Sequence, residues 1–301
     1  MILVDNRNNT DPYINLAIEE YLVRYADCIG KDYVLLYVNE ACIVVGKNQS
    51  IYKEINFEYL RNGKLKFCRR ISGGGTVYHD IGNVCFAFIS RFSEQKINNY
   101  RFFNQPVVNA LAEAGVTAEM DVRNNILFGT KKISGSAQFT DRKNIISHGT
   151  ILFNADLNTL RSCLAENDFK IETRAVGSVK SSVMNLMEAT DKFSLVEELK
   201  GFLVQHLAGE EVYSFSNEEW YAIQNLADEK FRTLEWIYGK SPATKIIKDE
   251  FEVEVVDGKV VSVQSAKWSL SNLIGVPYQF NEIQNALNSS PHASEILKAV
   301  F

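Results

Sequence analysis

The stretch Arg69-Arg70-Ile71-Ser72-Gly73-Gly74-Gly75-Thr76-Val77-Tyr78-His79 decides how the rest of the chain is interpreted. Three consecutive glycines destabilise the interior of a helix or strand, so the run needs a local reason. Residues 66–71 before it and residues 76–78 after it are rich in β-forming types, which places the glycines in a loop between two strands. Backbone N–H groups of such a loop can face an anion, and the arginines add positive charge. The pattern favours an anion-binding loop over a flexible surface loop.

The setting of this loop excludes two common nucleotide-binding motifs. It does not open a helix, as a dinucleotide-binding fingerprint does, and it lacks the Gly-Lys-Ser/Thr ending of a P-loop. A related phrase, Lys132-Ile133-Ser134-Gly135-Ser136-Ala137, returns later in the chain. Together the two phrases suit an anion with a carboxylate part and a phosphate part. Cations and amides would stabilise the charge that gathers when a carboxylate attacks the α-phosphate of a nucleotide, so we expect Lys132 to be catalytic.

Other candidate residues follow turns or lie beside predicted strands. Asn83 and Asn124 follow turn signals, so each either contacts a nucleotide or caps local backbone. His79 lies at the end of the glycine stretch, and His148-Gly149-Thr150 runs within a later predicted strand. For these histidines, packing and binding remain equally open. Cys85 and Cys163 have no basic neighbour that would lower a thiol pKa, which indicates buried hydrophobic side chains.

Composition narrows the class of protein. The 301 residues carry a net charge of −5 without a basic tail, which argues against a general nucleic-acid binder. We expect no secretory signal peptide, no membrane span and no membrane partner. Five cysteines without Cys-x-x-Cys spacing and four dispersed histidines indicate reduced thiols, a cytoplasmic protein and no metal-ligand set.

Periodicity predicts an α+β chain. Helices are expected from Pro12 through Tyr25, over 55–60 with a stop at Gly63, and over 102–114, 156–164 and 280–297, with strands over 1–4, 33–38 and 41–45. Residues 166–194 are predicted to be a long mobile connection. Asp257-Gly258 predicts a hairpin between two short strands. The Gly and Pro of Tyr238-Gly239-Lys240-Ser241-Pro242 suggest a boundary, with a catalytic domain over 1–240 and a small accessory domain over 246–301.

These phrases resemble the lipoate–protein ligases, a family related to biotin–protein ligases and octanoyltransferases. The resemblance covers nearly the whole chain. Its carriers are Arg69 through Asn83, Lys132 through Ala137, His148-Gly149-Thr150, Asn154-x-Asp156-Leu157, Ser178-Val179-Lys180, Asn185-Leu186 and Tyr238 through Pro242.

The resemblance implies a mixed sheet flanked by helices, like that of class II aminoacyl-tRNA synthetases and biotin ligases, followed by a small C-terminal α+β domain. It implies that ATP and Mg²⁺ activate lipoate to lipoyl-adenylate, with release of pyrophosphate. The lipoyl group then passes to a lysine of carrier domains, on 2-oxoacid dehydrogenase subunits or the glycine-cleavage H protein. We expect a monomer without a nucleic-acid partner.

By motif match, Lys132 should contact both the lipoyl carboxyl group and the phosphate. The expected binding residues are Arg70, Ser72, Gly73, Gly74, Gly75, Thr76, Val77, Tyr78, His79, Asn83, Asn124, Lys132, Ser134, Gly135, His148, Gly149 and Thr150.

The chain departs from the family pattern in two places. The usual Ser-Val-Arg-x-Arg phrase is here Ser178-Val179-Lys180-Ser181-Ser182, and lysine does not grip phosphate as arginine does. The C-terminal domain is also shorter than in the family's longer members.

Two other functions remain open at this point: a transferase that works through a cysteine thioester, and a non-catalytic module that binds lipoyl domains. The ligase is favoured because no cysteine lies in the glycine-rich or Ser-Gly phrases. Biotin is the nearest rival substrate, but the biotin enzymes have an arginine-rich glycine loop in place of Arg-Arg-x-Ser-Gly-Gly-Gly.

Overall fold

The computed structural model describes residues 1–301 and contains both helices and strands throughout. The strands are β1 (Ile2–Val4), β2 (Tyr33–Val38), β3 (Cys42–Val45), β4 (Lys66–Arg69), β5 (Val77–His79), β6 (Asn83–Arg91), β7 (Ala118–Met120), β8 (Ile126–Phe128), β9 (Lys131–Ser134), β10 (Ser136–Thr140), β11 (Asn144–Leu152), β12 (Lys170–Thr173), β13 (Val212–Tyr213), β14 (Thr244–Lys248), β15 (Phe251–Val256) and β16 (Lys259–Ser265). The α-helices are α1 (Pro12–Tyr25), α2 (Ile51–Glu54), α3 (Phe57–Asn62), α4 (Tyr100–Glu113), α5 (Leu157–Cys163), α6 (Val196–Leu207), α7 (Asn217–Leu226), α8 (Phe280–Leu287) and α9 (Ala293–Val300). Short 3-10 turns lie at Leu186–Glu188 and Ser271–Leu273, and π-helical turns at Ala227–Phe231 and Glu235–Gly239.

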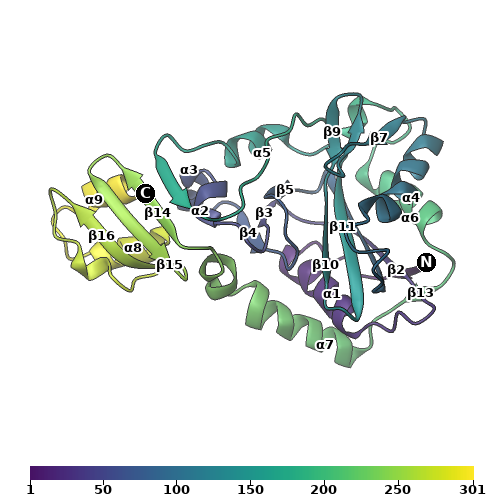
Figure 1. The fold of residues 1–301 in the computed structure, drawn as a ribbon, viewed down its shortest axis with the longest axis horizontal. Coiled ribbons are helices and arrows are strands. Elements are labelled where there is room, and N and C mark those ends of the chain that lie inside the picture. The colour runs from purple at the N-terminus through teal and green to yellow at the C-terminus, as the bar shows by residue number, and fades with distance from the viewer.

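The larger part of the molecule is built on a six-stranded mixed sheet with the order β10-β11-β6-β2-β1-β13 (Figure 1). Alternation along β2 explains its burial: Tyr33, Leu35 and Tyr37 join one hydrophobic cluster, and Val34 and Leu36 join another. Helices α1 and α7 pack on the first face, and α4 and α6 cover the second. The expected α+β class with a helix-flanked mixed sheet is confirmed.

Two three-stranded sheets carry the two sequence phrases. In the sheet β4-β3-β5, the glycine loop (residues 70–76) connects β4 to β5. In the sheet β7-β8-β9, Lys132 lies on β9, and Gly135 separates β9 from β10 of the central sheet.

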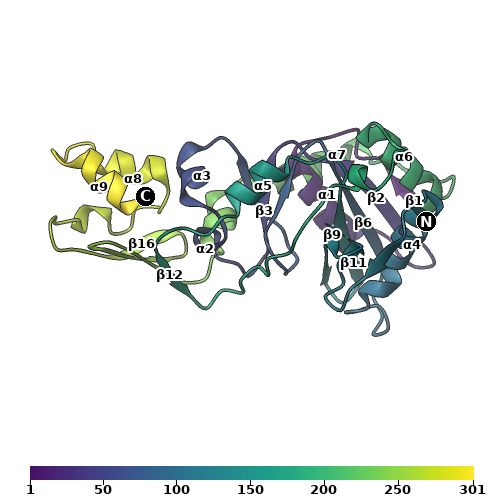
Figure 2. The same cartoon turned by 90° about the horizontal axis from the view of Figure 1, so that it is seen from above.

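A smaller lobe lies at one end of the elongated molecule, where β14, β15 and β16 carry α8 and α9 (Figures 1 and 2). The predicted hairpin is confirmed, since Asp257 and Gly258 join β15 to β16 with positive φ angles of 49° and 74°. Strand β12 extends this sheet by pairing with β14, and the Tyr52 ring packs edge-on against Tyr278 with 5.3 Å between ring centres. The lobe therefore shares strands and core with residues of the larger part.

Several predicted elements differ from those found. The helix expected over 55–60 is α3, which begins two residues later because Asn56 caps it through its side chain; Gly63 ends it in the left-handed conformation, as predicted. The short helix α2 before it was not predicted. The single helix expected over 280–297 is interrupted before α9 by Pro291, which cannot continue a helix.

The connection expected over 166–194 was only partly right, because it contains β12. This strand pairs with β14, more than 70 residues away in sequence, so no pattern in the adjacent residues predicted a strand there. No helix combines the length and the apolar character needed to cross a membrane.

Candidate active site

A cavity of about 400 Å³ lies beside the glycine loop and brings the two phrases together. The predicted residues on its wall are Arg70, Gly74, Gly75, Thr76, Val77, His79, Asn124, Lys132, Gly135, His148, Gly149 and Thr150. Ser72, Gly73, Tyr78, Asn83 and Ser134 lie off the wall.

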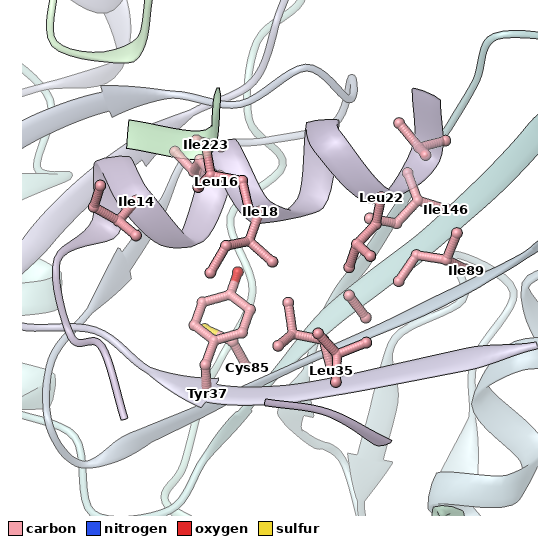
Figure 3. Close-up of a cluster of buried hydrophobic side chains, with 14 of the residues drawn as sticks. Ile14, Leu16, Ile18, Leu22, Leu35, Tyr37, Cys85, Ile89, Ile146 and Ile223 are labelled. Atoms are coloured by element: carbon pink, nitrogen blue, oxygen red, sulfur yellow. The ribbon is translucent and has the colours of Figure 1, made fainter. Parts of the chain in front are cut away.

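The wall has an apolar part and a polar part. Leu16, Tyr37 and Cys85 belong both to the cavity wall and to the hydrophobic cluster between α1 and the central sheet (Figure 3). Lys132 and the turn of Arg123 and Asn124 supply polar and cationic groups. Such a cavity suits an elongated ligand with one apolar and one charged end.

Arg70 holds the glycine loop from within. Its buried guanidinium donates to the carbonyl oxygens of Gly73 at 2.6 Å and Gly75 at 2.7 Å, and to the hydroxyl of Ser72 at 3.0 Å. Gly74 takes a φ of 89° in this loop, a conformation that glycine adopts without strain. Burial lowers the pKa of Arg70 to about 10, so it stays cationic at neutral pH. A fixed positive charge therefore lies directly against the loop.

Arg69 faces away from the cavity. Its guanidinium is fully buried and donates to carbonyl oxygens of Ile237 at 2.7 Å and Gln49 at 2.7 Å, and to the hydroxyl of Ser241 at 2.8 Å. The adjacent arginines therefore have separate roles, one at the glycine loop and one as a clamp between distant segments.

Lys132 is half-buried, and its side chain crosses the backbone of Gly135. A methyl group added at Gly135 would lie 2.7 Å from Lys132 Nζ. Burial lowers the pKa of Lys132, and Asp121 opposes that shift. The glycine thus makes room for an ammonium group that faces the cavity.

We expect Gly135→Ala to reduce activity without unfolding the chain. The new methyl group meets only the flexible end of Lys132, which can move aside at little cost in stability but leaves its position over the cavity. A shift of about 1 Å can cost about a hundredfold in rate. Steady-state kinetics and thermal melting measured on the same protein test this. The matched control is Gly201→Ala, at an exposed position of α6 away from the cavity, where the added methyl group meets nothing. A folded Gly135→Ala enzyme with unchanged kcat would contradict the packing argument.

Residues 176–183, hereafter the strap, cross one side of the cavity. The backbone N–H of Thr76 donates to the Ser178 hydroxyl at 2.9 Å, and Ser178 donates in turn to the carboxylate of Glu54. At the other end, Lys132 N–H donates to the carbonyl of Ser182 at 2.8 Å. Lys180, the residue that departs from the family pattern, lies off the wall and pairs with Glu166 at 2.8 Å, both side chains being exposed.

His148 stands between a serine and a glutamate. Its Nε2 lies 2.6 Å from Ser72 Oγ, and its Nδ1 lies 2.6 Å from Glu19 Oε2. Glu19 also accepts from the Tyr37 hydroxyl at 2.9 Å. The order of serine, histidine and glutamate resembles the catalytic triad of a hydrolase. However, Ser72 is buried, accepts a hydrogen bond from Arg70 and does not line the cavity. We infer that Ser72 and Glu19 hold the His148 ring in position.

Several residues of the site escaped sequence reasoning: Tyr37 and Arg123 line the cavity, and Glu19 lies behind His148. Glu19 and Tyr37 occupy periodic core positions of α1 and β2, so nothing marked them as polar partners. Arg123 shares a turn with Asn124, whose φ of 65° is a conformation that asparagine tolerates well, and the turn signal there could have found it.

Comparison with known proteins agrees with the sequence phrases. Residues 11–208 match the family model described as the lipoyl protein ligase A/B catalytic domain. Lipoate-protein ligase LplJ of Bacillus subtilis is 38% identical over 248 residues, 80% of this chain and 75% of that protein. Lipoate–protein ligase 1 of Staphylococcus aureus is 36% identical over 308 aligned positions, 96% of this chain and 94% of that one.

A solved structure resembles this fold over most of its length. The crystal structure of a lipoate-protein ligase A bound with ATP superposes with a TM-score of 0.66 at 23% identity, covering 80% of this chain and 98% of that one. At that identity the likeness concerns the fold.

Proposed function

The chain belongs to the lipoyl protein ligase A/B family, and from this premise we propose how its cavity carries out protein lipoylation. The protein is an ATP-dependent lipoate–protein ligase. It activates lipoate to lipoyl-adenylate with release of pyrophosphate, and it then transfers the lipoyl group to a lysine of a carrier domain. The observation that carries the assignment of the site is the meeting of Lys132 and the glycine loop on one cavity wall.

In the activation of lipoate, this chain provides positive charge and hydrogen-bond donors beside the reacting groups. The Lys132 ammonium neutralises charge on the attacking carboxylate and the α-phosphate, and the amides of Gly75 and Thr76 face the phosphate oxygens. Lys132 and the Gly75 amide are held before substrate arrives, so they stabilise developing charge without the cost of reorganising. The Thr76 amide now donates to Ser178, so the strap must yield this donor when a phosphate binds.

The apolar end of the cavity receives the acyl tail. Leu16, Val44, Cys85 and Tyr37 line that end and belong to the core between α1 and the sheet. Burial of a hydrocarbon chain there excludes water and contributes about 25 cal/mol for each Å² of apolar surface removed from water.

Magnesium would enter with the nucleotide. No group of three or more His, Cys, Asp or Glu side chains is arranged to hold a metal ion. Mg²⁺ commonly takes one or two carboxylates and completes its shell with phosphate oxygens and water. Asp121, which acts electrostatically on Lys132, is the carboxylate that we propose for this role.

A transferase mechanism through a cysteine thioester has less support than the ligase mechanism. All five cysteines are buried, and Cys85 is the cysteine on the cavity wall. Burial, with Glu19 nearby, raises the pKa of the Cys85 thiol well above its ordinary value, so a thiolate nucleophile is disfavoured at neutral pH.

The cellular setting is part of the proposal. We place the protein in the cytoplasm as a monomer that acts on lipoyl domains of 2-oxoacid dehydrogenase subunits and on the glycine-cleavage H protein.

We also propose 1–240 as the activating domain and 246–301 as an accessory domain, joined by the β12–β14 pairing.

The decisive experiment separates activation from transfer. Purified protein with ATP and Mg²⁺ should show ATP–pyrophosphate exchange only when lipoate is added, and an acceptor lipoyl domain should then gain the mass of one lipoyl group. Exchange that does not depend on lipoate would overturn the proposed activation. Exchange without a mass gain would remove the tested domain from the acceptors.

A further inference from the structure

A row of buried polar side chains joins α1 to the glycine loop. Its members are Glu19, His148, Ser72 and Arg70, and each is at least nine-tenths buried, with exposures of 1%, 8%, 1% and 6%. His148 Nδ1 lies 2.6 Å from Glu19 Oε2, and His148 Nε2 lies 2.6 Å from Ser72 Oγ. Arg70 Nε lies 3.0 Å from the same serine oxygen. The row therefore begins at a carboxylate of α1, passes through β11 and ends at the guanidinium that holds the glycine loop.

The arginine fixes the direction of every bond in this row. A guanidinium can only donate, so Ser72 Oγ accepts from Arg70. The other partner of the Ser72 hydroxyl is His148 Nε2, so the serine donates its proton to the ring. Because Nε2 accepts, the ring proton lies on Nδ1 and is donated to Glu19. A doubly protonated ring would leave the serine proton without an acceptor, so His148 is neutral in this arrangement.

The arginine end of the row decides which way the amides of the loop face. Arg70 Nη2 donates to the carbonyl oxygens of Gly73 at 2.6 Å and Gly75 at 2.7 Å. In a planar trans peptide unit, the N–H points opposite to the C=O. Because Arg70 holds the Gly75 carbonyl, the Thr76 N–H is turned away from the guanidinium, where it meets Ser178 Oγ at 2.9 Å. The orientation of Arg70 therefore sets the orientation of this amide donor.

The carboxylate end of the row also compensates the buried charge of Arg70. No carboxylate forms an ion pair with this guanidinium, and burial lowers its pKa, a shift that the charge of Glu19 opposes. The second oxygen of Glu19 accepts from the hydroxyl of Tyr37, whose ring reaches from its strand toward α1 (Figure 3), at 2.9 Å. Both carboxylate oxygens are thus held. A carboxylate near a cavity for anionic groups repels them, so this charge needs a role that outweighs the repulsion.

We propose that Glu19 is a positioning residue for the activation step. Through the Nδ1–H tautomer of His148 and the hydroxyl of Ser72, it holds Arg70 in the orientation that presents the loop amides to the α-phosphate. The inference rests on the proposed function, and it extends the role of Glu19 from the histidine ring to the glycine loop. Glu19 itself touches no substrate in this scheme.

The first test removes the charge of Glu19 and keeps its shape. In Glu19→Gln, the charge-assisted bond to His148 becomes a neutral one of about half the strength, so the row loosens. We expect kcat/KM for ATP in lipoate-dependent exchange to fall about tenfold, mainly through KM for ATP, with KM for lipoate nearly unchanged. The matched control is Glu20→Gln, because this neighbouring buried carboxylate of α1 pairs with Arg24 and Lys230 away from the cavity. It should lower the melting temperature without changing KM for ATP.

A double-mutant cycle with Ser72→Ala separates positioning from packing. Ser72→Ala removes the link between the ring and Arg70, so we expect it to raise KM for ATP as well. Because Glu19 acts through Ser72, adding Glu19→Gln to Ser72→Ala should change KM for ATP by less than about twofold. Additive effects of the two substitutions would overturn the proposal, since Glu19 would then act by another route.

Other results would also overturn the proposal. In wild-type protein at neutral pH, ¹⁵N chemical shifts of an Nε2–H ring or an imidazolium at His148 would refute the direction of the row. A folded Glu19→Gln protein with wild-type KM for ATP would show that the loop does not depend on Glu19. A loss confined to KM for lipoate would place the effect of Glu19 at the acid. Wild-type protein without lipoate-dependent exchange would refute the proposed function instead, whereas the tautomer can be measured without activity.

Discussion

Replacement of Lys132 by alanine is expected to abolish lipoate-dependent ATP–pyrophosphate exchange. The ammonium is the one lysine charge on the cavity wall, and the proposed transition state gathers negative charge beside it. Removal of one preorganised group of this kind usually costs about 10²–10³ in kcat. We expect at least that loss, because the same charge serves the carboxylate and the phosphate. Exchange of labelled pyrophosphate into ATP measures it.

Alanine at position 132 keeps the hydrogen bonds of the backbone there, so a loss of exchange can be assigned to the missing side chain. The Lys132 N–H donates to Ser182 and its carbonyl accepts from Met184, and alanine keeps both bonds. The melting temperature should therefore change little. Lys131→Ala is the matched control, since its side chain is the exposed neighbour on the same strand and does not line the cavity. Wild-type exchange in a folded Lys132→Ala protein would remove Lys132 from the chemistry.

Local patterns predicted the parts of the site that need unusual backbone. The glycine loop and Gly135 were visible because glycine there admits a close approach, at Gly135 by the lysine side chain. Lys132 was visible because its phrase repeats a basic-Ile-Ser-Gly order. Strand β2 and the start of α1 followed from alternation and from capping by Asp11. These features depend on neighbours within a few residues.

What the sequence concealed depends on distant partners. Glu19 and Asn39 look like ordinary residues of a helix and a turn, and only the fold brings them to His148 and His79. Strand β12 needed β14 to be recognised. Such pairings follow from tertiary packing, which overrides local propensity.

The adjacent arginines show the same limit. Both were interpreted as charge for an anion, yet Arg69 points away from the cavity and satisfies backbone groups of the 46–49 turn and of the segment 236–241. Arg69 is the last residue of β4 and Arg70 follows it directly, and successive side chains of an extended chain point to opposite faces. Which of these faces points to the cavity depends on how the sheets pack together, and the residues next to the arginines do not indicate it.

Arg69→Leu is expected to be the most destabilising single substitution considered for this chain. The guanidinium is fully buried, has no carboxylate partner and donates to carbonyl oxygens of Gly46, Lys47, Gln49, Trp236 and Ile237 and to the hydroxyl of Ser241. A buried acceptor left unpaired costs about 1–3 kcal/mol, and several are lost at once. We expect a loss of at least about 4 kcal/mol, which corresponds to a fall in melting temperature of about 10 °C.

The loss should spread from the clamp to the cavity, because the 46–49 turn supports the glycine loop. Gln49 Oε1 accepts from the Thr76 hydroxyl at 2.8 Å, and Lys47 N–H donates to the carbonyl of Ser72 at 2.8 Å. Arg69→Lys should rescue little, since one ammonium cannot reach acceptors on several sides as a planar guanidinium does. Arg61→Leu, at an exposed position of α3, is the control for loss of an arginine charge. If Arg69→Leu melted like the wild type, the carbonyl groups would have found other partners, and the clamp would not be what joins the two segments.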